Sequence, residues 1–106
     1  MNKPLKVLLH VSNEEQISRM QGNIVNLLKE DPTIDIKIVI NGNAVTNFTK
    51  DNNITLNDNA THYLCNNSLN ANNININNLT KNANVTPSGV YKIALLQEEG
   101  YLYIKV

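Results

Sequence analysis

The sequence predicts an α/β fold in which a mostly parallel sheet carries helices on both of its faces. Strand-like and helix-like patterns alternate along the chain, and the connections between them are short. Such repeats favour right-handed crossovers and parallel strands. The first apolar run, Leu5 to Val11, is nearly continuous, as expected for a strand covered on both faces. With 106 residues and 42% hydrophobic side chains, residues 1–106 fit one domain with one core.

A helix is predicted directly after the first strand. Ser12 follows that strand and Glu15 comes three residues later, which is the spacing of a capping box. The pair Asp31-Pro32 is expected to end the helix. Apolar residues recur at helical spacing between these two signals, namely Ile17, Met20, Ile24, Leu27 and Leu28.

The second strand is predicted from Ile34 to Ile40, and it ends at the pair Asn41-Gly42. An Asn-Gly pair can form the turn of a β-hairpin. The residues that follow, Ala44 to Phe48, do not alternate between apolar and polar. A loop that leads to a short helix is therefore the better prediction.

Two further strands are predicted, one from Thr61 to Cys65 and a shorter one from Asn82 to Val85. The segment between them is rich in asparagine, as is the whole chain, in which about one residue in five is Asn. Apolar residues still recur in this segment at spacings that anchor a short helix or turn. We interpret the bias as surface composition rather than disorder.

The last helix is predicted to begin at Thr86, with Pro87 in its first turn, where the missing N–H costs nothing. Gly100 lies where the helix is expected to stop. The chain then closes with a strand, Tyr101 to Val106, whose alternation predicts an edge strand or one that faces a partner subunit. The buried stripe of the last helix is predicted to comprise Val90, Ile93, Ala94 and Leu96.

Charge and cysteine content exclude several classes of function. The 9 basic and 9 acidic side chains cancel, and no segment concentrates Lys or Arg, so nucleic acid is not an expected partner. The single cysteine cannot form an internal disulfide. The chain begins with a short strand-like run rather than a long apolar segment. We therefore expect a cytoplasmic protein without a membrane partner.

Several polar residues are predicted to share one edge of the sheet. In open parallel sheets, ligands bind outside the carboxyl ends of the strands. The polar residues that follow the four predicted strands there are His10 and Ser12, Asn41 and Gly42, Cys65 with Asn66 and Asn67, and Thr86 with Ser88 and Gly89. Which of them touch one another depends on the strand order, which the sequence does not reveal.

Cys65 is the candidate reactive residue at this edge. A helix start is expected after it, and unpaired N–H groups at such a start favour a thiolate. Asn66, Asn67 and Ser68 are candidates to donate hydrogen bonds to the sulfur. The alternative is that Cys65 is only a small apolar residue, packed against its neighbours.

The two histidines support other chemistry less well. His10 is a candidate base or cation, or else a structural histidine at the end of an apolar strand, and His62 has a weaker claim. One cysteine and two scattered histidines give no metal-ligand spacing. No serine has the context of a nucleophile elbow. We expect neither a metal nor a cofactor.

Five short pieces of the chain, in order, resemble a known family. They are Val7-Leu8-Leu9-His10, Asn23 with Asn26-Leu27, Leu64 to Leu69, Pro87-Ser88-Gly89-Val90, and the closing segment from Gln97 to Lys105. In these pieces and in the order of its elements, the chain resembles the compact members of the DsrE/DsrF-like family of small α/β proteins. That family includes the sulfur-relay proteins of tRNA thiolation and sulfur oxidation.

The resemblance implies a fold, an assembly and a chemistry. The fold is a single-domain, flavodoxin-like three-layer sandwich with a mostly parallel five-stranded sheet. The assembly is a symmetric homotrimer or hexamer, of which we expect the trimer, with a dimer also open. The chemistry is that of a cysteine, at the position of Cys65, that carries sulfane sulfur as a persulfide.

Two functional hypotheses follow. In the first, Cys65 accepts sulfur from a donor protein or molecule and passes it to another thiol, with His10, Ser88 and Gly89 near Asn66 to Ser68 as candidate binding residues. In the second, the chain is a non-catalytic oligomeric binding or assembly module in which Cys65 is packed. The helix start at Thr86 to Gly89 would then bind a small anion. Thiol reactivity separates the two hypotheses.

The subunit interface is less well defined by the sequence. Val45 and Phe48, together with the face that carries Tyr101 and Tyr103, are predicted to form either an interface or part of the core.

Overall fold

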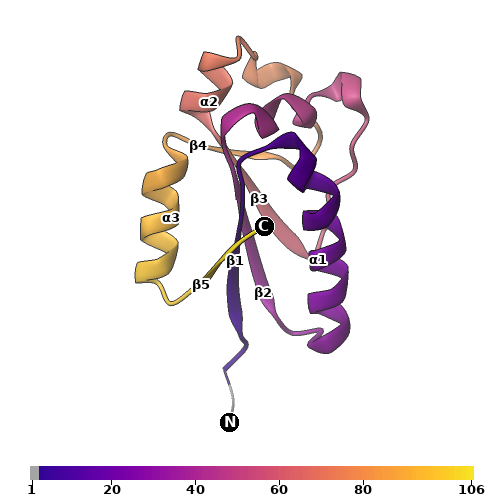
Figure 1. Cartoon of the computed structure of the whole chain (residues 1–106), viewed down its shortest axis with the longest axis vertical. Coiled ribbons are helices and arrows are strands. Elements are labelled where there is room, and N and C mark those ends of the chain that lie inside the picture. The colour runs from indigo at the N-terminus through magenta and orange to yellow at the C-terminus, as the bar shows by residue number, and fades with distance from the viewer. Residues whose placement is uncertain (1–2) are drawn as a thin grey trace.

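The computed structural model describes residues 3–106, which form a five-stranded sheet with helices on both faces (Figure 1). The strand order is β4-β3-β2-β1-β5, and every neighbouring pair is parallel. The predicted three-layer α/β sandwich is confirmed. The strands are β1 (Lys6–Val11), β2 (Asp35–Ile40), β3 (Ala60–Cys65), β4 (Asn84–Thr86) and β5 (Leu102–Lys105).

Three α-helices and four short 3₁₀ segments connect the strands. The α-helices are α1 (Ile17–Glu30), α2 (Asn66–Ala71) and α3 (Gly89–Glu98). The 3₁₀ segments are η1 (Glu14–Gln16), η2 (Gly42–Phe48), η3 (Lys50–Asn52) and η4 (Ile76–Asn78). The loop and short helix predicted after Asn41-Gly42 correspond to η2.

The strand order decides which connection covers which face. From β1 to β4 the chain steps in one direction across the sheet, and from β4 to β5 it returns past β1. Because crossovers between parallel strands are right-handed, a reversal of direction moves the connection to the opposite face. Accordingly α1 and α3 lie on opposite sides of the sheet (Figure 1). We call these sides the α1 face and the α3 face.

Each face has its own buried core. On the α1 face, alternate strand residues pack against α1, η2 and α2. The α3 face has a smaller core, made of Leu8, Val39, Leu96 and Tyr101. The largest members of the α1-face core are Leu9, Met20, Ile24, Ile36, Ile38, Ile40, Phe48, Leu64 and Leu69. Val45 and Phe48 are fully buried, so of the two predicted roles they belong to the core.

The helical segment after β1 is capped at Asn13, one residue later than predicted, and starts as the 3₁₀ segment η1 before α1. The side-chain oxygen of Gln16, not of Glu15, accepts hydrogen bonds from the backbone N–H groups of Ser12 and Asn13, at 2.9 and 3.2 Å. A glutamine can fill this place because a capping box requires only an acceptor three residues after the cap. The predicted end is confirmed, since Asp31 follows the last residue of α1.

The cap of the last helix is two residues later than predicted. The strand before it, β4, spans Asn84–Thr86 rather than the predicted Asn82 to Val85. Thr86 is the last residue of β4 and pairs with Cys65, so it does not cap a helix. The cap is Ser88, whose hydroxyl oxygen accepts the backbone N–H of Tyr91 at 3.3 Å. Pro87 therefore lies before α3 rather than in its first turn.

The predicted stripe of α3 is only partly buried. Leu96 is buried and Ile93 is half-buried, whereas Val90 is 71% exposed and Ala94 is also exposed. The helix is apolar on both sides, so periodicity alone did not select the face that meets the sheet.

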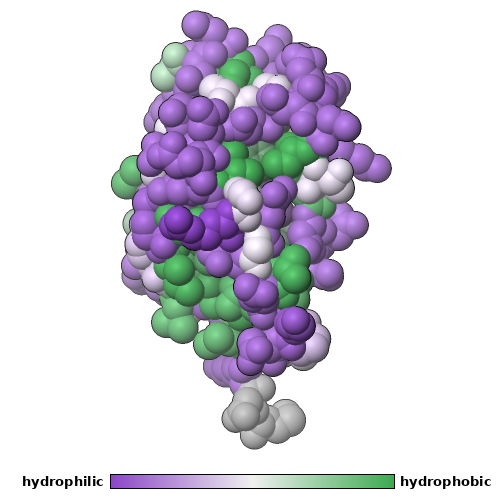
Figure 2. All heavy atoms as spheres, turned by 45° about the vertical axis from the view of Figure 1, so that its right-hand side comes forward, coloured by the Kyte–Doolittle hydropathy of each residue, from purple (hydrophilic) through white to green (hydrophobic). Residues whose placement is uncertain are grey.

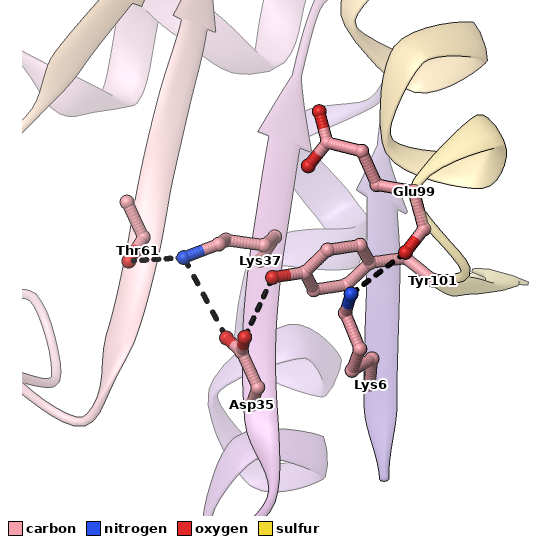
Figure 3. A network of polar contacts seen from close by, with 6 residues as sticks. All are labelled: Lys6, Asp35, Lys37, Thr61, Glu99 and Tyr101. Atoms are coloured by element: carbon pink, nitrogen blue, oxygen red, sulfur yellow. Dashed lines mark hydrogen bonds and ion pairs between the residues drawn. The ribbon is translucent and has the colours of Figure 1, made fainter. Parts of the chain in front are cut away.

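A polar network fastens the start of β5 to the amino ends of β1 and β2 (Figure 3). The Tyr101 hydroxyl donates to Asp35 at 2.6 Å, and the Lys6 ammonium donates to the Glu99 carbonyl at 2.7 Å while lying 4.6 Å from the Tyr101 ring centroid. Lys37 completes the network at 3.5 Å from Asp35. Burial and the neighbouring Asp35 raise the pKa of Tyr101, so it stays protonated and serves as a structural donor.

Candidate functional site

The strand order places Cys65 where the chain connections diverge. β3 continues into α2 on the α1 face, and its neighbour β4 continues into α3 on the opposite face. Two adjacent parallel strands whose connections leave on opposite faces form a topological switch point, the usual ligand site of such sheets. Cys65 ends β3 and pairs with Thr86 at the end of β4. The only cysteine therefore lies at the switch point.

The first turn of α3 lies directly over the Cys65 sulfur. The Gly89 backbone N–H donates a hydrogen bond to Sγ at 3.2 Å. A Cβ atom at residue 89 would lie only 3.1 Å from the Cys65 Cβ, so glycine allows this close approach. The Cys65 side chain is 5% exposed. The thiol is thus covered by backbone that also donates to it.

Ser68, in the first turn of α2, also acts on the thiol and lowers its pKa. Its hydroxyl oxygen accepts the backbone N–H of Gly42 at 2.9 Å, which leaves the hydroxyl proton for Sγ. Burial raises the pKa of the Cys65 thiol, but the hydroxyl of Ser68 and the backbone N–H groups of Ser68, Gly89 and Asn67 outweigh it, so the pKa is lowered. The arrangement favours a thiolate.

Gly42, the first residue of η2 after β2, positions Ser68 through its backbone N–H. Its φ of 62° lies in the left-handed region, and a Cβ there would lie 2.6 Å from the Ser12 carbonyl oxygen. Only glycine fits both conditions. The pair Asn41-Gly42 thus marks a tight turn that aims a backbone N–H at Ser68, rather than a hairpin.

His10 belongs to a second cluster on the same edge. Its Nε2 lies 2.9 Å from Asn41 Oδ1, and its Nδ1 lies 2.7 Å from the Tyr103 hydroxyl. Burial lowers the pKa of His10, the Asn41 hydrogen bond raises it, and the charge of Lys105 lowers it further. With Nε2 donating to Asn41, the neutral ring accepts the Tyr103 proton at Nδ1.

The two clusters are separated by one strand. β2 lies between β1, which carries His10, and β3, which carries Cys65, so their backbones are about 10 Å apart at the usual strand spacing. The Asn41 Cβ nevertheless lies 3.4 Å from where a Cβ of residue 89 would stand. Asn41 therefore bridges from His10 toward the Gly89 backbone that covers the thiol.

The predicted site residues divide into two groups. Cys65, Ser68, Gly89 and the backbone of Asn67 come together, whereas His10 stands one strand away. The hydroxyl oxygen of Ser88 accepts a backbone N–H within α3, and no hydrogen bond from the Asn66 side chain is formed among residues 3–106.

The sequence interpretation placed Tyr103 on a face that forms either an interface or part of the core, and placed Asn41 and Gly42 at the end of the second strand and on the edge of the sheet, but gave none of the three a role in the site. The Asn-Gly pair was the available signal for a tight turn. Nothing marked the contact between Tyr103 and His10, because it depends on β5 lying beside β1.

Residues 3–106 contain neither a cluster of metal-ligand side chains nor a membrane-spanning helix. No three His, Cys, Asp or Glu side chains gather there in a way that could hold a metal ion. No helix in that part of the chain combines the length and the apolar character needed to cross a bilayer.

The comparisons with known proteins establish the fold. A scan against protein-family models and a search of curated proteins find no match. Among solved structures, the chain is similar to the protein of unknown function MTH1491 from Methanobacterium thermoautotrophicum, with a TM-score of 0.83. The two sequences are 22% identical, and the superposition covers 96% of this chain and 99% of the other. This likeness shows a shared fold and leaves the activity to be argued from the site.

Proposed function

We propose that this protein carries sulfane sulfur as a persulfide on Cys65. The observation that carries the proposal is the hydrogen bond from the Gly89 N–H to Sγ at 3.2 Å, beside which Ser68 lowers the pKa of the thiol. Both effects favour the thiolate, which is the form that attacks sulfur. The switch-point position of Cys65 adds support, since ligands of parallel sheets bind there.

The transfer needs no oxidant or metal. The Cys65 thiolate attacks the outer sulfur of a donor persulfide, so a new S–S bond forms at Sγ while the donor's own S–S bond breaks and the donor leaves as a thiolate. In the second step, an acceptor thiolate attacks the outer sulfur and Cys65 leaves as a thiolate. The donors from Gly89 and Ser68 stabilise Cys65 in both the attacking and the leaving state.

The low exposure of Cys65 restricts the donor. Because the side chain is 5% exposed, only the terminal sulfur of a slim donor reaches it unless the first turn of α3 moves. The resemblance to the DsrE/DsrF-like family in the segments around Cys65 and Gly89 supports the same chemistry, with a donor or acceptor protein as partner. A reducing compartment such as the cytoplasm would keep the lone thiol available.

Thiol alkylation across pH tests the proposal. We expect native Cys65 to react with a small haloacetamide at a pH below that needed by the unfolded chain, because its donors lower the thiol pKa. Ser68→Ala should slow alkylation at pH 7 by about fivefold, since a hydrogen bond to a charged group is lost while intrinsic nucleophilicity rises in part. The exposed Ser18→Ala is the matched control and should leave the profile unchanged. A native thiol that reacts only after denaturation would refute the proposal.

One observation favours a second candidate function. The 5% exposure of Cys65 is also what a structural cysteine would show, in a module that binds a small ligand without sulfur transfer. The N–H groups of Gly89 and Tyr91 in the first turn of α3 already donate to Cys65 and Ser88, so such a ligand would bind elsewhere on this edge of the sheet. In that case alkylation of the native protein is negligible at every pH at which it stays folded.

Assembly is part of the proposal, because α3 leaves an apolar outer face. Val90 and Tyr91 are 71% and 66% exposed, and Ala94 and Leu95 continue the same side of the helix. A helix that is apolar on all sides is normally covered on all sides. Since this face adjoins the turn over Cys65, we propose that it forms the interface of a homotrimer.

Light scattering after size exclusion tests the assembly. We expect a mass of about three times the 11.9 kDa of one chain, and Tyr91→Glu should reduce it to that of one chain, because a buried charge without a partner is costly. Val25→Glu, at a 57% exposed position of α1, is the matched control and should leave the mass unchanged. A wild-type mass of one chain would contradict the proposed interface.

A further inference from the structure

A cavity opens on the α1 face, away from Cys65. It lies between α1, the segment that precedes β3, and the middle of β3, and its volume is about 230 Å³. Strand residues point alternately to the two faces, so His62 lines this cavity while Cys65, three residues later, lies on the α3 face. The surface on this side of the molecule is mainly polar, with apolar areas between the polar side chains (Figure 2).

The walls of the cavity suit an uncharged, mostly apolar molecule. Met20, Ile24 and Val25 of α1 and Leu56 provide the apolar surface, and none of the lining side chains carries a formal charge at pH 7 when His62 is neutral. A charged ligand would lose hydration without meeting an opposite charge, because the other polar lining residues, Gln21, Thr55 and Asn57, are neutral. An apolar cavity of about 150 Å³ already holds benzene, so a six-membered aromatic ring with a substituent fits here. The thioether of Met20 also favours an aromatic ring.

His62 supplies the single deeply buried polar group of the wall. His62 is 2% exposed, and the Ala60 backbone partly offsets the effect of burial on the pKa of its ring. Among residues 3–106 no hydrogen bond joins either ring nitrogen to another group, yet no fully buried side-chain nitrogen or oxygen lacks a partner there. At least one ring nitrogen is therefore not fully enclosed, and the ring lines the cavity. Burial lowers the pKa of His62 to about 4, so at neutral pH one nitrogen of the ring is an unprotonated acceptor.

We propose that this cavity binds a small neutral aromatic molecule that carries one hydrogen-bond donor, of the phenol or indole class, with the donor directed at His62. The apolar walls bind the ring, and the ring nitrogen of His62 selects the donor. The site is separate from the proposed sulfur chemistry, because it opens on the other face of the sheet.

Methyl-resolved NMR titration with phenol and with toluene tests this site. We expect phenol to shift the methyl signals of Met20, Ile24 and Leu56 saturably, and to bind about fivefold more tightly than toluene, which lacks the donor. In His62→Leu, which removes the acceptor, phenol should bind no more tightly than toluene. Benzoate, which is charged, should leave the three signals unchanged.

A second variant tests the cavity without replacing the buried His62, whose substitution can destabilise the fold. Val25 lies at the cavity and is 57% exposed, so Val25→Phe narrows the cavity without disturbing the core and should weaken phenol and toluene alike. Val85→Phe makes the same change at a 40% exposed position of β4 and should weaken neither. Equal binding of phenol and toluene by the wild type, or the absence of saturable shifts at the three methyl groups, would overturn the proposal. Neither result bears on Cys65.

Discussion

Acidification from pH 7 to pH 4 is expected to cost the folded protein up to about 3 kcal/mol of stability through His62 alone. The ring is 2% exposed, and burial lowers its pKa from 6.5 to about 4. The unfolded chain therefore takes up a proton near pH 6.5 while the folded chain does not. The contribution of His62 is fully present above pH 6.5 and is lost as the pH falls toward 4.

Urea unfolding at a series of pH values between 7 and 4 measures this loss. His62→Leu should flatten the decline in the free energy of unfolding over this range, because the group whose proton binding differs between the states is gone. His10→Gln is the matched control, since His10 is only half-buried, and it should retain most of the decline. Wild type and His62→Leu declining in parallel would show that His62 is not held neutral by the fold.

The layers of the fold could be predicted from the sequence because they depend on local signals. The continuous apolar run before Ser12, the helical spacing from Ile17 to Leu28 and the stop at Asp31-Pro32 lie within single elements. Each signal reflects burial against the sheet, which periodicity reports directly.

Predictions failed where local signals competed. Thr86 and Ser88 are both good helix caps, and only the pairing of Thr86 with Cys65 in the sheet decides for Ser88. Val90 has the spacing of a buried residue, but the sheet beneath α3 meets the side that carries Leu96.

The site itself depended on the strand order, which is a property of the whole chain. Cys65 and Gly89 are 24 residues apart and meet only because β3 and β4 are neighbours. The same order moves His10 one strand away and brings Tyr103 beside it. The cavity at His62 could likewise not be predicted from the sequence. Its walls come from α1, β3 and the segment before β3, and no sequence pattern shows that these elements lie side by side.

On the proposed function, Cys65→Ser is expected to abolish sulfur loading, because Cys65 carries the only thiol in the chain. The serine hydroxyl keeps the size and the hydrogen bonds of the site but is not ionised at neutral pH, so it does not attack a persulfide. Ser68→Ala should load more slowly than the wild type and reach the same end point, because it weakens the thiolate without removing it.

Intact-protein mass spectrometry after exposure of the native protein to a small-molecule persulfide is the most direct measurement of the central claim. We expect the wild type to gain the mass of one sulfur atom per chain, to lose it when an acceptor thiol is added, and Cys65→Ser to gain none. A wild-type protein that gains sulfur only after it has been unfolded, or a Cys65→Ser protein that gains as much as the wild type, would contradict the assignment of Cys65 as a sulfur carrier.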